Sequence, residues 1–217
     1  MTAKIFTVYT AITNNFDLPA DSNILNFNGY SKFRDPRRNA KIYKALSNHY
    51  IHTPYNIWID GNVKLNCDPE VLIEMMGDKE ALVFSHPARD CIYDEAKICI
   101  QAKKDSADVI NTQVGHYHDL GYPPHNGLAS CRLIVRKNTE QIAQLNALWW
   151  AEICAGSVRD QISFPFIFRD LVKYIPHPAS LDNEFFTVKK HRKSIRFLGG
   201  IRMPWQKHIC GLHSAQK

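Results

Sequence analysis

The sequence lacks any apolar run of the roughly 18 to 20 residues that a helix needs to cross a bilayer. Its first residues are too polar and too few for a signal peptide, and they lead directly into a strand-like pattern. The six cysteines include no C-x-x-C pair, which argues against a zinc knuckle or a disulfide scaffold and fits reduced thiols. No internal repeat or low-complexity segment is present. These absences predict a cytoplasmic globular protein.

The composition is that of an ordinary soluble domain. The chain has 217 residues, of which 45% are hydrophobic and 22% charged, and this predicts a single domain over residues 1–217 with a core of its own. The net charge of +6 and the pI near 9.0 imply an anionic partner. Nucleic acid, a nucleotide or a phospholipid surface would each suit, so charge alone does not choose among them.

The stretch Y-N-I-W-I-D-G-N at residues 55–62 sets an apolar run against an acidic turn. Its β-branched and aromatic residues predict a buried strand, and Asp60, Gly61 and Asn62 predict the turn that ends it. Ligands of open α/β sheets bind at the carboxyl ends of the strands, where this carboxylate would lie. Asp60 is therefore either a metal ligand or only part of a turn.

A helix with a basic stripe is predicted before this strand. The D-P pair at residues 35–36 is typical of an N-cap followed by the first helical residue, and the apolar spacing carries the helix to about residue 50. Arg37, Lys41 and Lys44 repeat along one side of it. Such a stripe is either a solvated face or a group of cations that neutralises phosphate.

Two further segments carry candidate site residues. His86 and Arg89 follow a short apolar strand predicted at residues 81–84, again where ligands gather, whereas Glu95 is interpreted as an ordinary polar position on the next helix. Ser157 and Asp160 have capping-box spacing, which gives Asp160 a structural role.

A basic run lies near the end of the sequence. It extends from Lys189 to Lys193 and reads K-K-H-R-K. It is a solvated tail, a phosphate contact or a patch that holds the protein at a membrane surface.

Several motifs together resemble a family of glycosyltransferase-like domains, formerly a domain of unknown function, with members in bacteria and in plant cell-wall polysaccharide biosynthesis. The motifs are V-Y-T-A-I at residues 8–12, D-P-R-R-N-A-K at 35–41, W-I-D-G-N at 58–62, H-P-A-R-D-C-I-Y-D-E-A at 86–96, W-W-A-E at 149–152 and R-D-Q-I-S-F at 159–164. They follow one order across about three quarters of the chain.

The resemblance implies an α/β fold of GT-A type, with a Rossmann-like mixed sheet flanked by helices. Residues 1–100 would bind the nucleotide sugar and residues 101–217 the acceptor. By analogy Asp60 and Asn62 would hold Mn²⁺ or Mg²⁺ in a DXD-like motif. Asn62 is a neutral and weaker ligand, so a third ligand is needed, and His177 and His191 are candidates.

The resemblance also implies roles for the remaining site residues. The donor would contact Tyr9, Thr10, Arg37, Lys41, Lys44, His86 and Arg89. Asp160 and Gln161 resemble an Asp-Gln pair beside the sugar in retaining transferases, which favours retention of anomeric configuration, and Glu152 is a weaker catalytic candidate. The acceptor would be a glycan, a glycolipid or another molecule.

Two other classes of function compete with this interpretation. Members of the resembling family have also been described as ceramide hydrolases, so a metal-dependent hydrolase is one alternative. A basic module that binds nucleic acid is the other, although the basic residues here lack interleaved aromatic residues. We expect nucleic acid to be the less suitable partner.

Overall fold

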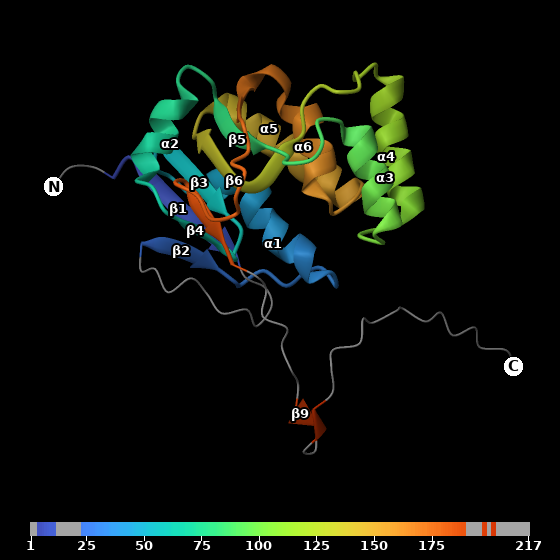
Figure 1. Ribbon diagram of the computed structural model, residues 1–217, viewed down its shortest axis with the longest axis horizontal. Helices are drawn as coiled ribbons and strands as arrows, with labels where there is room; N and C mark the ends of the chain where they lie inside the picture. Colours follow the sequence, from blue (N-terminus) through green and yellow to red (C-terminus); the bar gives the residue numbers. More distant parts are fainter. Residues whose placement is uncertain (1–3, 12–22, 190–196, 199–200, 203–217) are drawn as a thin grey trace, which may run out of the picture.

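The computed structural model describes residues 4–11, 23–189, 197–198 and 201–202. Its centre is a six-stranded mixed sheet in the order β2-β1-β3-β6-β5-β7 (Figure 1). All neighbouring strands run parallel except β6, which is antiparallel to β3 and to β5. The bounds are β1 Phe6–Ala11, β2 Ile24–Phe27, β3 Tyr55–Ile59, β5 Ala81–Ser85, β6 Ala129–Lys137 and β7 Val172–Ile175.

The ends of several strands lie along one edge of this sheet. The parallel strands β1, β3 and β5 all finish there, and β6 begins there because Ser85 at the end of β5 pairs with Ala129. The predicted strand before Asp60 is confirmed as β3. Its carboxyl end therefore lies at the edge where open α/β sheets bind ligands.

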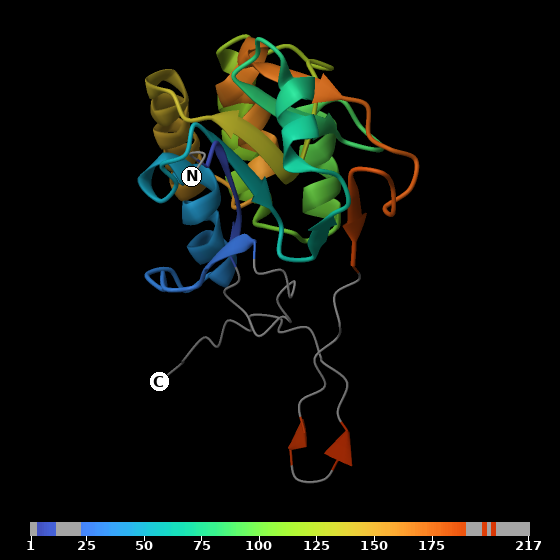
Figure 2. The same cartoon turned by 90° about the vertical axis from the view of Figure 1, so that its left-hand side faces the viewer.

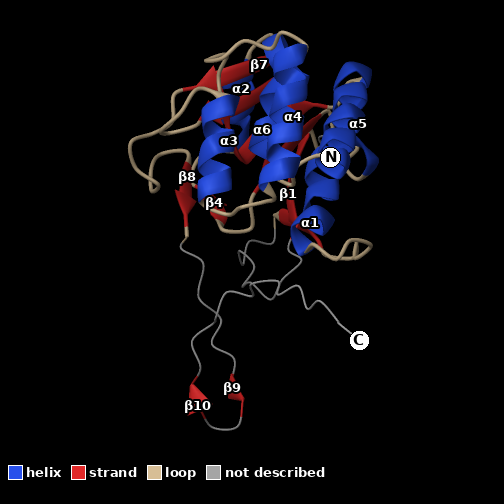
Figure 3. Cartoon of the chain, turned by 90° about the vertical axis from the view of Figure 1, so that its right-hand side faces the viewer, coloured by secondary structure: helices blue, strands red, loops and turns tan. Residues whose placement is uncertain are grey.

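One face of the sheet is covered by three helices: α1 Pro36–Ala45, α5 Glu140–Ala155 and α6 Asp160–Phe168. Trp149 of α5 and Phe164 of α6 are fully buried against Tyr9 and Trp58 of the sheet within one apolar cluster. The helices α3 Ile92–Gln101 and α4 Ala107–Asp119 extend this layer by packing on α6, as Figure 3 shows. Burial of these aromatic residues helps to stabilise this face.

The other face carries the helix α2 Pro69–Met76 and a small antiparallel pair, β4 Val63–Leu65 with β8 Phe186–Val188 (Figure 2). Leu72 and Met76 of α2 pack with Ile57 and Ile59 of β3. Residues of β3 thus alternate between the two faces, as the period of a strand requires. A separate two-stranded pair consists of β9 Phe197–Leu198 and β10 Ile201–Arg202.

The helix α1 is shorter than the sequence predicted. It begins as expected, with the Asp35 carboxylate accepting from the Arg37 backbone N–H at 2.9 Å, but it ends at Ala45 instead of near residue 50. A 3₁₀ turn, η1 Ser47–His49, follows it. Asn146 of α5 donates to the buried Ser47 hydroxyl at 3.2 Å, and this tertiary contact outweighs the apolar spacing that favoured a longer helix.

A second 3₁₀ turn, η2 Arg169–Leu171, joins α6 to β7. Within the described ranges, no helix combines the length and the apolarity that a membrane crossing would require.

Two glycines allow a matched test of the helical layer. A Cβ added at Gly156 would lie 2.4 Å from the Gln113 side chain, which is buried between α4 and α5, whereas a Cβ at Gly115 would meet nothing within 4 Å. We expect Gly156→Ala to lower the free energy of unfolding by about 1–3 kcal/mol through overpacking. Gly115→Ala should raise it by about 0.5–1 kcal/mol, because Gly115 lies inside α4. Urea unfolding of both variants measures the difference, and equal effects would contradict this packing.

Candidate active site

The backbone geometry of β3 determines where Asp60 points. Side chains two residues apart on a strand share a face, so Asp60 follows Trp58 toward the α1 side. The Trp58 indole N–H donates to Asp60 Oδ1 at 2.9 Å, and the Asp60 backbone N–H donates to the Arg132 carbonyl at 2.8 Å. The Val63 N–H closes the predicted turn by donating to the Asp60 carbonyl at 2.8 Å. The carboxylate is therefore fixed in direction, although its side chain remains 41% exposed.

Lys44 of α1 lies between two carboxylates. Its Nζ is 3.1 Å from Asp60 Oδ1 and 2.7 Å from Asp160 Oδ2, and its side chain is only 2% exposed. The ammonium also lies 5.3 Å from the centre of the Trp58 ring, within cation–π range. The interpretation of the basic stripe as a solvated face is thus wrong for Lys44. The end of α1 packs on β1 and α5, which brings this lysine inside the protein.

Asp160 is the second buried charge of this group. It lies in the first turn of α6 with its side chain 4% exposed, and its Oδ2 is 2.5 Å from Lys41 Nζ as well as close to Lys44. We call Asp60, Asp160, Lys41 and Lys44 the ionic quartet. It links the end of β3 to two helices that are far apart in the sequence.

The predicted capping box at Ser157 is not formed. The Ser157 hydroxyl donates to Asp105 Oδ2 at 2.8 Å and accepts from the Arg159 backbone N–H, and the Ser157 N–H donates to Gln113. Because other residues satisfy Ser157, the Asp160 carboxylate turns to the two lysines instead.

The charges of the quartet shift the pKa values of its members. Burial acts to raise the pKa of the Asp160 carboxyl, but the ammonium groups of Lys41 and Lys44 outweigh it and hold that pKa well below the ordinary value. Burial acts to lower the pKa of Lys44, yet Asp160 and Asp60 together raise it. For Lys41, burial lowers the pKa despite the attraction of Asp160. Asp160 is therefore ionised and Lys44 protonated at neutral pH.

A second buried ionic group lies beside the first. Glu95 of α3 accepts from Arg89 Nε at 2.7 Å, and Arg159 Nη2 is 3.8 Å from its other oxygen. The interpretation of Glu95 as an ordinary polar position is wrong, because its side chain is buried on the apolar side of α3. Arg159 precedes Asp160 in the chain, so the start of α6 joins the two groups.

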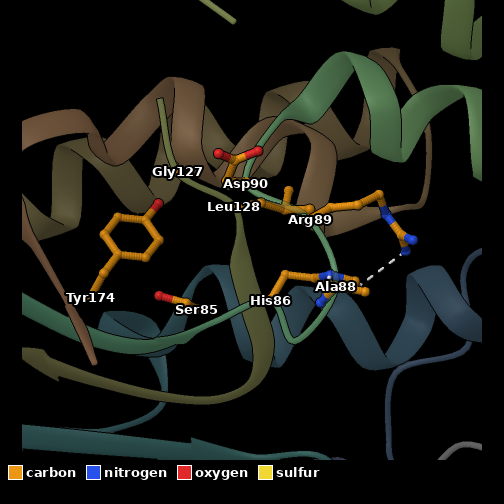
Figure 4. Close-up of a pocket in the computed structure, with 8 residues that line it drawn as sticks. All are labelled: Ser85, His86, Ala88, Arg89, Asp90, Gly127, Leu128 and Tyr174. Atoms are coloured by element: carbon orange, nitrogen blue, oxygen red, sulfur yellow. Dashed lines mark hydrogen bonds between the residues drawn. The ribbon is translucent and has the colours of Figure 1, made fainter. Parts of the chain in front are cut away.

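His86 and Arg89, predicted to bind the donor, line a pocket just beyond β5. Arg89 Nη2 and His86 Nε2 are 3.3 Å apart, and a dashed line marks this contact in Figure 4. Burial lowers the pKa of His86, which favours the neutral ring at physiological pH. The pocket has a volume of about 520 Å³ and its other lining residues are Ser85, Ala88, Asp90, Gly127, Leu128 and Tyr174.

The remaining metal-ligand candidates lie in different surroundings. Asn62 donates through Nδ2 to the Lys189 carbonyl at 3.1 Å, which ties the turn after Asp60 to the end of β8. His177 Nδ1 lies 2.6 Å from the Pro178 carbonyl and its ring packs on Phe186. His191 lies outside the described residues, as does most of the basic run that begins at Lys189.

Two predicted donor contacts are buried in the sheet. Tyr9 is fully buried and its hydroxyl accepts from Arg136 Nη2 at 2.7 Å. Thr10 is fully buried too, and its hydroxyl has no hydrogen-bond partner among the described residues. Arg37 is held at the start of α1 by Asp35 at 2.7 Å and donates to the Lys104 carbonyl.

Two predicted catalytic residues make contacts within the protein. Gln161 Nε2 donates to the Ala129 carbonyl at 3.2 Å, which fixes α6 to the start of β6. Glu152 accepts from the Tyr117 hydroxyl and from Gln113, so it joins α5 to α4. Glu152 therefore lies outside the ionic quartet, whereas Gln161 lies next to it.

Some site residues carried a signal in the sequence. The positions of Ile92, Glu95, Ala96 and Cys99 follow the i, i+3, i+4, i+7 spacing of a buried helix face, which would have placed Glu95 inside. Trp58 lies two residues before Asp60 on the same strand face, which makes its indole N–H a predictable partner. The mutual approach of Lys44 and Asp160 had no local signal.

These features define the protein class. A mixed sheet with an aspartate after a central strand, basic residues on the first helix and a pocket at the carboxyl edge make this an α/β domain of GT-A type. The chain belongs to the TOD1/MUCI70 glycosyltransferase-like domain family, whose model matches residues 27–196. The family expected from the motifs is thereby confirmed.

A curated relative has a similar sequence. The probable hexosyltransferase MUCI70 of Arabidopsis thaliana is 28% identical over 144 residues, which cover 61% of this chain and 25% of that protein. This chain thus spans about a quarter of the length of the relative.

Solved structures of glycosyltransferases are similar to this chain at lower sequence identity. The glycosyltransferase GlyE of Streptococcus pneumoniae TIGR4 is 11% identical with a TM-score of 0.36, over 70% of this chain and 31% of that one. A glycosyltransferase involved in glycosylation of the major capsid of PBCV-1 is 9% identical with a TM-score of 0.43, over 80% and 81% of the two chains.

The ionic quartet makes a prediction for stability and its pH dependence. Asp160→Asn leaves two lysines without their buried partner and should lower the free energy of unfolding by about 3 kcal/mol at neutral pH. Since the pKa of Asp160 is lowered in the folded state, its contribution is present above the ordinary value of 3.8 and lost as pH falls below it. Urea unfolding should therefore show that the difference in free energy of unfolding between the wild type and Asp160→Asn narrows from pH 7 to pH 3.

A matched control is Asp119→Asn, whose carboxylate is 83% exposed. This variant should change the free energy of unfolding by less than about 0.5 kcal/mol at either pH. A gap for Asp160→Asn that stays constant across this pH range would contradict the assigned ion pairs.

Proposed function

We propose that this chain is a metal-dependent glycosyltransferase that moves a sugar from a nucleotide-sugar donor to a glycan or another acceptor. The curated relative is named as a probable hexosyltransferase, which favours a hexose as the transferred sugar. The observation that carries the proposal is the ionic quartet, in which Asp60 faces the ammonium groups of α1 at the carboxyl edge of the sheet. A leaving nucleoside diphosphate develops negative charge, and fixed cations in such a place would stabilise it.

The net charge of the quartet supports a need for a metal ion. Two carboxylates balance two ammonium groups, so the quartet has no formal charge to spare for a diphosphate. Charges about 4 Å apart interact by about 4 kcal/mol near a protein surface, which makes an uncompensated dianion unfavourable beside Asp60. A divalent cation bound together with the donor would remove this repulsion.

Asp60 has a free oxygen for such an ion. Its Oδ1 is taken by Trp58 and Lys44, while its Oδ2 makes no hydrogen bond to the described residues. Asn62 uses its amide nitrogen in a hydrogen bond, which leaves its amide oxygen as a second hard ligand. Mg²⁺ and similar ions are often held by one or two protein oxygens with phosphates and water, so this small set fits. When bound, the ion would supply Lewis-acid stabilisation of the departing diphosphate.

The lysines and the pocket would have separate roles. Lys41, with its side chain 18% exposed, is the more accessible ammonium and would contact the diphosphate, while Asp160 would hold both lysines in position. The pocket beside His86 and Arg89 has the volume of a small-ligand site and would take the sugar or the acceptor. Asp160 and Gln161, at the start of α6, would face the sugar in a retaining reaction.

The first test is a thermal-shift panel of nucleoside diphosphates and nucleotide sugars, with and without Mn²⁺. A ligand at about 100 times its dissociation constant adds roughly 2.7 kcal/mol of stability. For a chain of this length that corresponds to a rise of about 5–10 °C in the midpoint. We expect one nucleotide to give a Mn²⁺-dependent rise that Asp60→Ala loses and that Asp119→Ala keeps. A folded wild type with no nucleotide-dependent rise would overturn the proposal.

The second test follows the stereochemistry of transfer. With the donor found by the first test, proton NMR of the early product should show the same anomeric configuration as the donor. Water can serve as the acceptor if no glycan is known, because slow donor hydrolysis passes through the same site. A product of the opposite configuration would contradict retention while leaving the transferase assignment in place.

A further inference from the structure

A second group of metal-ligating side chains lies outside the ionic quartet, at the start of α3. Cys91, Asp94 and His125 each offer one ligand atom, and these three atoms lie within 4.8 Å of one another. In the described part of the chain they form the one such group of three among histidine, cysteine and acidic residues. A thiol, a carboxylate and an imidazole are the ligand types that zinc takes in proteins.

Local structure explains why the three groups meet. Cys91 is the N-cap of α3 and Asp94 lies three residues later, so their side chains share one side of the first turn. The Cys91 side chain makes no capping hydrogen bond, and its sulfur makes none to any other described residue. A metal binds cysteine in its thiolate form. His125 comes from the loop that precedes β6.

A carboxylate contacts the imidazole of His125. Asp90 Oδ1 lies 2.8 Å from His125 Nδ1, so the carboxylate holds the ring and leaves Nε2 for another partner. A carboxylate behind a histidine is the usual arrangement around zinc ligands, where it fixes the ring and raises its basicity. The exposed pair of His118 and Asp119, 3.6 Å apart, shows the same residue types without a nearby thiol.

We propose that Cys91, Asp94 and His125 bind a zinc ion, with Asp90 as a positioning residue. The thiolate and imidazole favour zinc over Mg²⁺ or Mn²⁺, which prefer oxygen ligands. Bonds of about 2.0–2.3 Å in a tetrahedron place ligand atoms about 3.5 Å apart. The exposed side chains of Asp94 and His125 must therefore close in by about 1 Å, and Asp94 must exchange its contact with Lys97 at 3.0 Å. Three protein ligands leave a fourth position for water.

The proposed ion would lie beside the pocket. Asp90 lines the pocket together with Gly127 and Leu128, which follow His125 in the chain (Figure 4). An ion held by Cys91 and His125 would fasten the loop before β6 to the start of α3. The zinc site would thus set the shape of the pocket and would be separate from the ion proposed at Asp60.

The test uses Co²⁺ as a spectroscopic probe of the full chain. We expect one equivalent to give the near-ultraviolet thiolate-to-cobalt band of a bound cysteine, and Zn²⁺ to displace it. Cys91→Ser should abolish the band, and His125→Ala should weaken Zn²⁺ binding at least tenfold in competition with a chromophoric chelator. Asp90→Asn should weaken Zn²⁺ binding about 10- to 100-fold while the thiolate band persists at saturation.

Matched controls make the result specific. His118→Ala and Cys154→Ser should leave the band and the affinity unchanged, since neither residue belongs to the group. Asp60→Ala should also keep the band, so failure of this inference is distinguishable from failure of the proposed transferase site. A folded wild type without the band, or a band that survives Cys91→Ser or is lost in Cys154→Ser, would overturn the proposal.

Discussion

The buried ammonium of Lys44 is the interaction on which the carboxyl edge of the sheet depends. It contacts Asp60 after β3 and Asp160 at the start of α6, and it belongs to α1, so one charge connects three elements. A buried ammonium is costly unless it is paired, and this one has two carboxylates within 3.1 Å. The placement of α1 and α6 on the sheet is therefore coupled to the direction of the Asp60 side chain.

A second buried cation, the guanidinium of Arg136, holds the backbone of Lys44 in place. Arg136 of β6 is fully buried and donates to the Tyr9 hydroxyl at 2.7 Å and to the Lys44 carbonyl at 2.6 Å. It also donates to Asn146 of α5 at 2.6 Å. The backbone of Lys44 is thus held from the sheet while its side chain is held by carboxylates. Rigid support of this kind is what a preorganised site requires.

Features that depend on neighbouring residues were predictable from the sequence, whereas contacts between residues far apart in the chain were not. The strand before Asp60 and the cap at Asp35 depend on neighbouring residues, so local patterns sufficed. The family followed from six motifs in one order. The burial of Lys44 depends on a carboxylate far along the chain, which no local period records. The unformed capping box at Ser157 failed for the same reason, because Asp105 and Gln113 compete for that serine.

The free-energy cost of burying the ionic quartet bears on the function of the protein. Well-packed apolar residues in place of a buried ion pair are often neutral or stabilising by 1–4 kcal/mol, so folding alone gives little reason to bury Lys44 with Asp160. A site that must neutralise a departing diphosphate gains from charges fixed before the reaction, because they need no reorganisation when charge develops. Burial lowers the pKa of Lys41, yet Asp160 holds its ammonium at the surface side of the quartet. Under the proposed function, the arrangement would sacrifice stability for a cation fixed at the carboxyl edge of the sheet.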